Sequence, residues 1–471
     1  MMTSAVPKEK DVERLRRWRD RQAVRTASAG VGAQILSLAV RAAVIPLSLK
    51  LLGTERYGLW LAVGSLVAWG GLADFGLSAG LVNVVAKASG RSGVTEMRRH
   101  ISTGLVAYGV LATILIGAAF LVARWRGLPR LLGAANNAAL ASDARLLVAV
   151  CGMAFAATIG LQTFPMVCSA LQEGYFGSFA YLGGSIGSVV LLLRLVWRGP
   201  SLLAYALVMV MPPLVAQLGL GAFVFGSRHQ ELRPSWRLCN GQSLRSLLDI
   251  GGPMALDQVA NIGILYSANV LIANRLAPAM VPKYAIPYSL FAIVNGTAYL
   301  IANSYMPAYA EASGNADWHW IRRRALRSLY AVVGLVAVID AGLLIIGRKL
   351  IAIWAGQQIV PAFGFLIALA SYGLLRAFSE TNGVLLVGLG VVKLKASLQL
   401  TVAVTMVVGG WLLLPKLGVL AIPILGSLGC ALNAGVALPY ALQLLRGNEG
   451  DTALPRLASP PFLRMEVSPK C

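Results

Sequence analysis

Long runs of apolar residues constrain the fold of this chain more than any other feature. A helix that crosses a bilayer needs about 20 mostly apolar residues. Windows of that kind recur along the whole chain, at roughly 24–49, 58–86, 101–123, 146–171, 177–197, 201–226, 246–273, 284–308, 325–347, 359–386, 397–415 and 418–444. The sequence therefore predicts an all-α integral membrane protein with twelve transmembrane helices and short connections.

The composition leaves little room for a separate soluble domain. Of the 471 residues, 57% are hydrophobic and 13% are charged, whereas soluble domains carry about 25% charged residues. The three histidines fall in polar segments and the five cysteines have no CxxC spacing, so neither a metal site nor a disulfide framework is expected. The net charge of +22 suggests basic cytoplasmic loops rather than nucleic-acid binding.

The positions of Lys and Arg predict that both termini are cytoplasmic. With that orientation, most basic residues fall on the inner side, as the positive-inside rule requires. The arginines between residues 124 and 145 oppose this assignment. Residues 1–24 form a cytoplasmic basic arm with two open interpretations, an amphipathic helix on anionic lipid or a solvated topology anchor, and residues 445–471 form a cytoplasmic tail.

A repeated segment divides the chain into two halves. "AKASGRSGVTEMRRH" (86–100) aligns without gaps to "AEASGNADWHWIRRR" (310–324), an offset of 224, and each copy lies between the second and third windows of its half. This predicts two six-helix lobes, 25–226 and 246–444, joined by a cytoplasmic linker, 227–245. Repeated halves around a central site are a transporter architecture. The alternative is a chance similarity between two basic loops.

The sequence carries no motif for catalysis. It has no GxxxxGK[ST], HExxH or GxSxG segment, so a P-loop ATPase, a zinc protease and a serine hydrolase of those types are not indicated. It also has no large outer loop of the kind that glycan polymerases and ligases use. We therefore expect a transporter with no catalytic residues, rather than a membrane enzyme.

A few charges lie inside the apolar windows, where charged residues usually face a bundle interior or a water-filled path. Arg41, Asp74 and Asp257 have no partner on their own helix and are candidate pathway residues. Their alternative role is an interhelical ion pair, such as Arg41 with Asp74. Arg376 and Glu380 are spaced i,i+4 and either pair on one helix face or mark a local opening of the helix. Charges nearer the window ends are expected to be structural: Arg194, Asp249 and Asp340.

The stretch "LLGTERYGLWLAVGSLVAWGGLADFGLSAGLVNVVAKASG" (51–90) resembles the opening of the Wzx-type flippases of the polysaccharide biosynthesis family. There, an LG-x-x-x-YG turn precedes a second span that carries an aspartate before a Gly-rich segment. "LQEGYFGSF" between windows 4 and 5 fits the same pattern. This family lies in the MOP superfamily, with the MATE-like multidrug antiporters and the lipid II flippase.

The resemblance implies a substrate and a mechanism. An undecaprenyl-pyrophosphate-linked oligosaccharide would move from the inner to the outer leaflet of the bacterial plasma membrane, for O-antigen, capsule or exopolysaccharide synthesis. Two lobes would work by alternating access. Partners would be the lipid-linked oligosaccharide, membrane lipids and the polysaccharide polymerase machinery, but no nucleic acid.

The physical demands of that substrate suggest site residues. Pyrophosphate needs cationic partners, and arginine binds phosphate bidentately, which makes Arg41 and Arg376 the headgroup candidates. Acids in the lumen would couple transport to a proton or sodium gradient without another cofactor. These acids are Asp74, Asp257 and Glu380. The candidates for sugar contacts are Gln258, Asn261, Tyr266, Asn295 and Asn303.

Two other functions stay open from the sequence. A cation-coupled multidrug exporter of the same fold would use Asp74 and Asp257 as its exchange pair. A membrane glycosyltransferase or a non-transporting scaffold is the alternative from another class.

Overall fold

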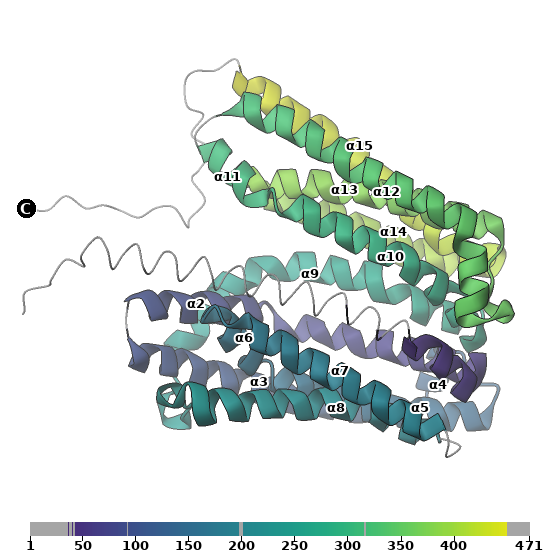
Figure 1. The fold of residues 1–471 in the computed structure, drawn as a ribbon, viewed down its shortest axis with the longest axis horizontal. Helices are drawn as coiled ribbons and strands as arrows, with labels where there is room; N and C mark the ends of the chain where they lie inside the picture. Colours follow the sequence, from purple (N-terminus) through teal and green to yellow (C-terminus); the bar gives the residue numbers. More distant parts are fainter. Residues whose placement is uncertain are drawn as a thin grey trace, which may run out of the picture. The chain divides into compact units, whose positions relative to one another are not determined.

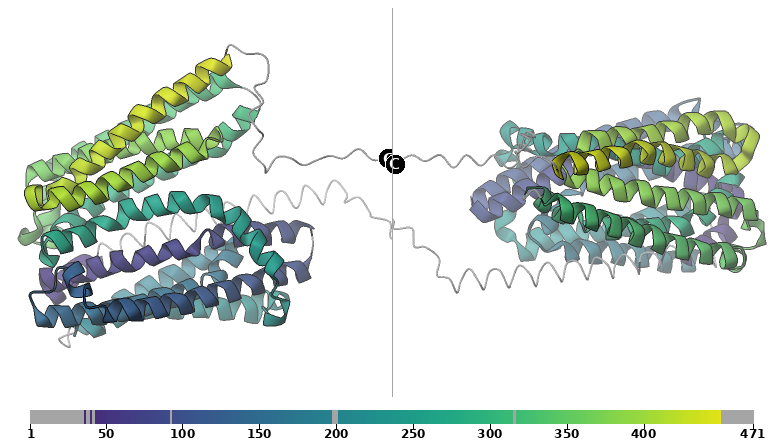
Figure 2. Two further views of the ribbon diagram at one scale, coloured as in Figure 1. Left: turned by 180° about the vertical axis from the view of Figure 1, so that it is seen from behind. Right: turned by 90° about the horizontal axis from the view of Figure 1, so that it is seen from above.

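The computed structural model describes residues 36, 40, 43–91, 93–196, 201–314 and 317–449. The predicted basic arm, Arg41 and most of the predicted C-terminal tail lie outside this part, and so does the side chain of Asp257. Nearly all described residues are helical, and no strand occurs among them. Within each part of the fold, long helices run beside one another (Figures 1 and 2).

The chain forms two compact units. One holds Met1–Gln258 and Ala277–Val281, and the other holds Val259–Leu276 and Pro282–Cys471. The division falls inside a single long helix, α9 (Gly241–Arg275), so the chain passes from one unit to the other without a loop at that point.

The first unit contains the N-terminal helices. In chain order these are a helix over residues 43–68, the 3₁₀ helix η1 (Trp69–Asp74), α2 (Leu77–Arg91), α3 (Val94–Arg124), α4 (Leu128–Leu131), α5 (Ala138–Gly160), α6 (Thr163–Ala170), α7 (Gly174–Val196), α8 (Leu202–Phe223), the π-helical turn η2 (Val224–Arg228), the 3₁₀ turns η3 (Gln230–Leu232) and η4 (Trp236–Leu238), the start of α9, and η5 (Pro278–Met280). The main packing pairs are α3 with α5 and α7 with α8.

The second unit contains the rest of α9 and the C-terminal helices. These are α10 (Val281–Asn303), α11 (Met306–Gly314), α12 (Trp318–Ala355), η6 (Gln357–Ile359), α13 (Phe363–Gly388), α14 (Val392–Leu417), η7 (Gly418–Leu420) and α15 (Ala421–Glu449). Here α13 packs against both α12 and α15, and α14 also packs against α15.

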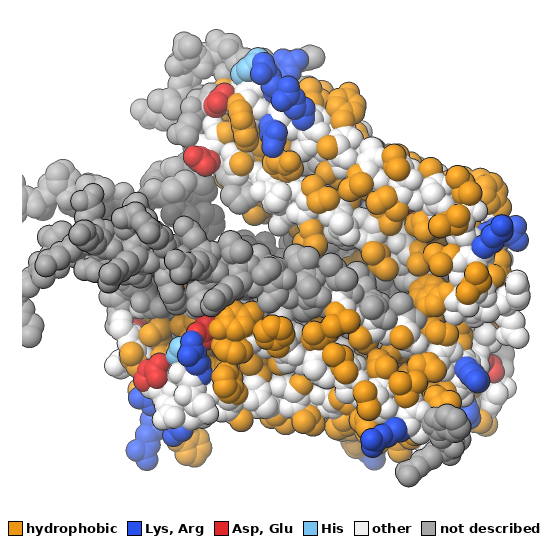
Figure 3. All heavy atoms as spheres, in the orientation of Figure 1, with side chains coloured by type: hydrophobic (Ala, Val, Ile, Leu, Met, Phe, Trp, Pro, Cys, Tyr) orange, Lys and Arg blue, Asp and Glu red, His pale blue; other side chains and the backbone are white. Residues whose placement is uncertain are grey.

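Eight helical stretches among the described residues are long and apolar enough to cross a membrane. One of them, Val392–Gln443, has 52 residues and covers both α14 and most of α15. On the face drawn in Figure 3, hydrophobic and uncharged side chains cover the middle of each unit, and charged side chains gather at its ends. The protein is therefore a multi-pass membrane protein.

The helix boundaries follow the sequence repeat. The first copy ends α2 and begins α3 at Val94, and the second copy ends α11 and begins α12 at Trp318, which is the same offset of 224. Both copies thus place a basic helix start at the same point of their half.

The window 58–86 differs from one continuous helix. It is interrupted by η1 and by two residues with left-handed backbone, Phe75 (φ 44°) and Gly76 (φ 78°). Glycine adopts this conformation without steric cost. The break places Asp74 at the end of a tight turn instead of in the middle of a regular helix.

Candidate functional site

The carboxylate of Asp74 is held by hydroxyl groups of the first unit. Asp74 is buried, and its Oδ1 accepts hydrogen bonds from Tyr108 Oη at 2.9 Å and from Ser78 Oγ at 3.0 Å. The Ser78 backbone N–H donates to Oδ2 at 3.4 Å. These donors replace part of the water that a carboxylate loses on burial, which is how Asp74 is tolerated in a buried position.

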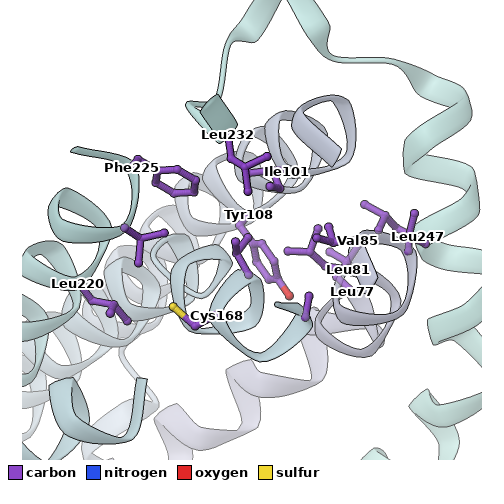
Figure 4. Packing of buried hydrophobic residues seen from close by; sticks show 14 of the residues in the cluster. Leu77, Leu81, Val85, Ile101, Tyr108, Cys168, Leu220, Phe225, Leu232 and Leu247 are labelled. Atoms are coloured by element: carbon purple, nitrogen blue, oxygen red, sulfur yellow. The ribbon is translucent and has the colours of Figure 1, made fainter. Parts of the chain in front are cut away.

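Tyr108 connects this polar turn to the core. It lies on α3 and is completely buried, among apolar side chains of α2, α3, α6 and α8 (Figure 4). Its ring therefore packs in the core while its hydroxyl reaches Asp74. The pairing is not predictable from the sequence, because Tyr108 is 34 residues from Asp74; the only signal for it is a lone tyrosine in an apolar window.

Gln258, a predicted sugar contact, also meets the broken helix. Its Nε2 donates a hydrogen bond to the carbonyl oxygen of Gly71 at 2.9 Å. Because η1 interrupts regular helical hydrogen bonding, a side-chain donor is useful at that carbonyl. Asp74 and Gln258 thus both form hydrogen bonds around η1. Their roles in transport stay predictions.

Arg376 lies on α13 in the second unit and is surrounded by tyrosines. Its Nη1 donates to Tyr372 Oη at 3.1 Å and to Tyr288 Oη at 3.4 Å. The rings of Tyr284 and Tyr288 stack with centroids 5.3 Å apart, and those of Tyr288 and Tyr372 lie 6.5 Å apart at 20°. The guanidinium is thus oriented by tyrosine hydroxyls, which are neutral and do not balance its positive charge.

Glu380 does not pair with Arg376 in the way that the i,i+4 spacing allows. Its Oε1 instead accepts a hydrogen bond from Gln399 Nε2 on α14 at 2.7 Å. Among the residues that the structure describes, Arg376 forms no salt bridge, and Glu380 attracts it only electrostatically. A half-buried cation whose hydrogen-bond partners are neutral is suited to receive an anionic group.

The other predicted sugar contacts lie in the second unit, on α9 and α10. Asn261 is half-buried and Tyr266 is about one-third exposed on α9. Asn303 is half-buried at the end of α10. Asn295 donates from Nδ2 to the Phe291 carbonyl at 3.0 Å, while its buried Oδ1 has no partner. The structure therefore leaves these assignments as predictions.

Three segments predicted to be cytoplasmic meet at one end of the first unit. Arg98 Nε donates to the Arg233 carbonyl at 3.1 Å, and the Ser235 N–H donates to Ser102 Oγ at 2.9 Å. The loop before α7 joins them through Glu173.

Glu173, in the "LQEGYFGSF" segment, is the centre of that junction. Its carboxylate accepts from Arg228 at 2.9 Å and lies 3.1 Å from His229 Nε2. Burial acts to raise the pKa of Glu173, but the contacts with Arg228 and His229 together outweigh burial and lower it. The motif thus joins the start of α7 to the end of α8.

Within the described part of the chain, no group of three or more His, Cys, Asp or Glu side chains could hold a metal ion. The polar features of the spans are instead separate hydroxyl, amide, carboxyl and guanidinium groups. Such groups can bind and orient a polar solute.

Comparison with solved structures identifies the fold, although no family model matches the chain. An inward-facing multidrug resistance MATE family transporter of the MOP superfamily aligns with a TM-score of 0.71 and 15% identity, over 89% of this chain and 99% of that one. The lipid II flippase MurJ, in an inward closed conformation, aligns with a TM-score of 0.68 and 10% identity, over 90% and 91%. The fold is therefore that of the MOP-superfamily transporters.

A curated relative is more specific. The chain is 23% identical over 374 residues to a Yersinia pseudotuberculosis protein named "Putative O-antigen export protein", which covers 78% of this chain and 83% of that protein. Together, these similarities confirm the resemblance to the polysaccharide flippases and their superfamily that the sequence indicated.

Proposed function

We propose that this protein flips an undecaprenyl-pyrophosphate-linked oligosaccharide from the inner to the outer leaflet of the bacterial plasma membrane. The reaction supplies cell-surface polysaccharide synthesis. Transport proceeds by alternating access of two six-helix lobes, with twelve spans and both termini in the cytoplasm. Support comes from similarity to an O-antigen export protein and from a fold shared with a lipid II flippase.

The observation that carries the proposal is the environment of Arg376. Its guanidinium lies within a candidate span, Phe363–Gly388, and is oriented by the hydroxyls of Tyr372 and Tyr288. A pyrophosphate headgroup supplies the anionic partner that those neutral hydroxyls do not.

The same observation separates this proposal from the multidrug exporter. An exporter of cationic compounds needs an acidic site, whereas the cation at Arg376 favours an anionic substrate. The solved MATE structures keep the exporter as the second candidate. Roles for Arg41, Asp257 and Glu380, coupling to a proton or sodium gradient, and cooperation with polymerase machinery belong to the same proposal.

The direct test is binding of a pyrophosphate-lipid analogue to the purified full-length protein. Arg376→Ala removes the charge and should weaken binding about tenfold to hundredfold, the effect of losing a charge-assisted hydrogen bond. Arg376→Lys should keep part of the affinity, since lysine retains the charge but not the planar fork.

Arg324→Ala is the matched control. Arg324 lies in the same unit, with its Cζ 5.0 Å from the Tyr305 ring centroid, and it is exposed. The Arg324→Ala variant should bind the pyrophosphate-lipid analogue as the wild type does. If Arg376→Ala binds the analogue normally and Arg324→Ala does not, the headgroup site lies elsewhere. In a deletion strain, lipid-linked oligosaccharide should accumulate in the inner leaflet; loss of its synthesis would instead indicate an enzyme.

A further inference from the structure

The second unit contains a buried carboxyl group that the proposed function does not use. Asp340 lies on α12 with 1% of its surface exposed. Neither Oδ1 nor Oδ2 has a hydrogen-bond partner among the described residues. The sequence suggested a structural residue near a helix end, but a structural carboxylate normally has donors.

The surroundings of Asp340 supply no compensating charge. Its helix packs against α11, α13 and α15, and α10 comes close through Asn295. Among the described residues, no side chain hydrogen-bonds or ion-pairs with Asp340. Arg376 is bonded to Tyr372 and Tyr288. The titratable or charged side chains on the helices around Asp340 include Arg348 and Lys349 on α12, Tyr372, Arg376 and Glu380 on α13, Cys430 on α15 and Tyr288 on α10.

A second acceptor without a partner lies beside the first. Asn295 on α10 also has a buried Oδ1 with no partner. A Cβ built on Gly373 would lie 2.8 Å from Asp340 Oδ2 and 3.0 Å from Asn295 Nδ2. The two side chains therefore approach the same point of α13, and the lack of a side chain at Gly373 makes room for them.

We propose that Asp340 and Asn295 form a proton-binding site. A proton on Asp340 turns one acceptor into an O–H donor and removes the charge from an apolar position. The Asn295 amide approaches the same point of α13 through Nδ2, and turning that amide presents its unpaired Oδ1 to the acid proton. An oxygen-binding metal cation would need several more ligands than the Asp340 carboxylate and the Asn295 amide.

The use of this site in transport rests on the proposed function, but the binding of the proton does not. If a lobe rearrangement exposes Asp340 to water on one side, the proton is released there. Proton binding would then favour one arrangement over the other, as any ligand-driven shift requires. This gives the transporter a coupling carboxyl on α12, separate from the headgroup candidate Arg376.

The test uses dicyclohexylcarbodiimide, an apolar reagent that modifies protonated carboxyl groups. The full-length wild-type protein in detergent is treated from mildly acidic to mildly alkaline pH, and modification at Asp340 is measured by peptide mass spectrometry. We expect modification of Asp340 that falls severalfold as the pH rises and is the same in sodium and choline chloride. Asp143, which is paired with Arg56 at 3.1 Å, serves as the internal control and should stay unmodified.

Two results would overturn the site. Absence of modification at Asp340 at every pH would mean that the carboxyl carries no accessible proton. Protection by sodium at fixed pH would identify a metal-cation site instead. Asn295→Leu should move the modification to more acidic pH, because it removes the acceptor of the acid proton; an unchanged profile would exclude Asn295. These measurements need no transport substrate, so their failure leaves the flippase proposal intact.

Discussion

The hydroxyl of Tyr108 should stabilise the first unit through the charge of Asp74. Tyr108→Phe removes only the Oη atom that donates to Asp74 Oδ1 at 2.9 Å. The ring stays in its apolar surroundings, where Tyr108 is completely buried. The change therefore leaves no large cavity, and its effect on stability reports the hydrogen bond.

The structure sets the expected size. A hydrogen bond to a charged group contributes about 1.5–3 kcal/mol. Asp74 keeps the Ser78 hydroxyl at 3.0 Å and the weaker backbone donor at 3.4 Å. We therefore expect a loss of about 2 kcal/mol in the free energy of unfolding, in the lower half of that range.

Tyr205→Phe is the matched control within the same unit. Tyr205 is also completely buried, and its hydroxyl is 2.8 Å from Ser48 Oγ, a neutral partner. A neutral hydrogen bond contributes about 1 kcal/mol, so this variant should lose about half as much stability. Both changes remove the same atom from the same residue type and differ mainly in the charge of the partner.

The assay is denaturant unfolding of the full-length protein in detergent, with Tyr108→Phe, Asp74→Asn and the double variant forming a cycle. The coupling energy should account for most of the Tyr108→Phe effect. A loss equal to or smaller than that of Tyr205→Phe, together with a coupling near zero, would refute the claim that hydroxyl donors hold the Asp74 charge.

Three further predictions follow from other parts of the fold. Because the pKa of Glu173 is lowered in the folded protein, its ionised carboxylate stabilises the fold above the ordinary glutamate pKa of about 4.3, and this stabilisation is lost as the pH falls. Glu173→Gln should therefore make the melting temperature fall less steeply at acidic pH. An unchanged fall at acidic pH would contradict this. Gly373→Ala should destabilise the protein because its Cβ would lie 2.8 Å from Asp340 Oδ2. The control Gly342→Ala, whose Cβ would have nothing within 4 Å, should be neutral or stabilising by about 0.5–1 kcal/mol. Equal effects of the two changes in thermal unfolding would refute the close approach at Gly373. Cys239 is exposed in the predicted cytoplasmic linker. In a variant with the C-terminal cysteine replaced, Cys239 should resist membrane-impermeant thiol reagents in intact cells and react after the cells are permeabilised. Labelling of Cys239 in intact cells would reverse the predicted orientation.

The sequence by itself determined the helical membrane architecture. The length of an apolar run fixes whether a helix can cross the bilayer, and this property depends only on consecutive residues. The same holds for the repeat: α3 and α12 begin at the offset of 224 that the two basic loops share. Such features are local, so the printed sequence was sufficient to predict them.

The partners of the buried polar groups were decided only by the tertiary structure. The i,i+4 rule allowed Arg376 to pair with Glu380, but tyrosines on α10 and α13 and a glutamine on α14 engage them instead. Asp340 looked structural from its place in a window, yet it is buried without a donor. Which groups meet depends on the rotation and packing of whole helices, and the pattern along one helix does not contain that information.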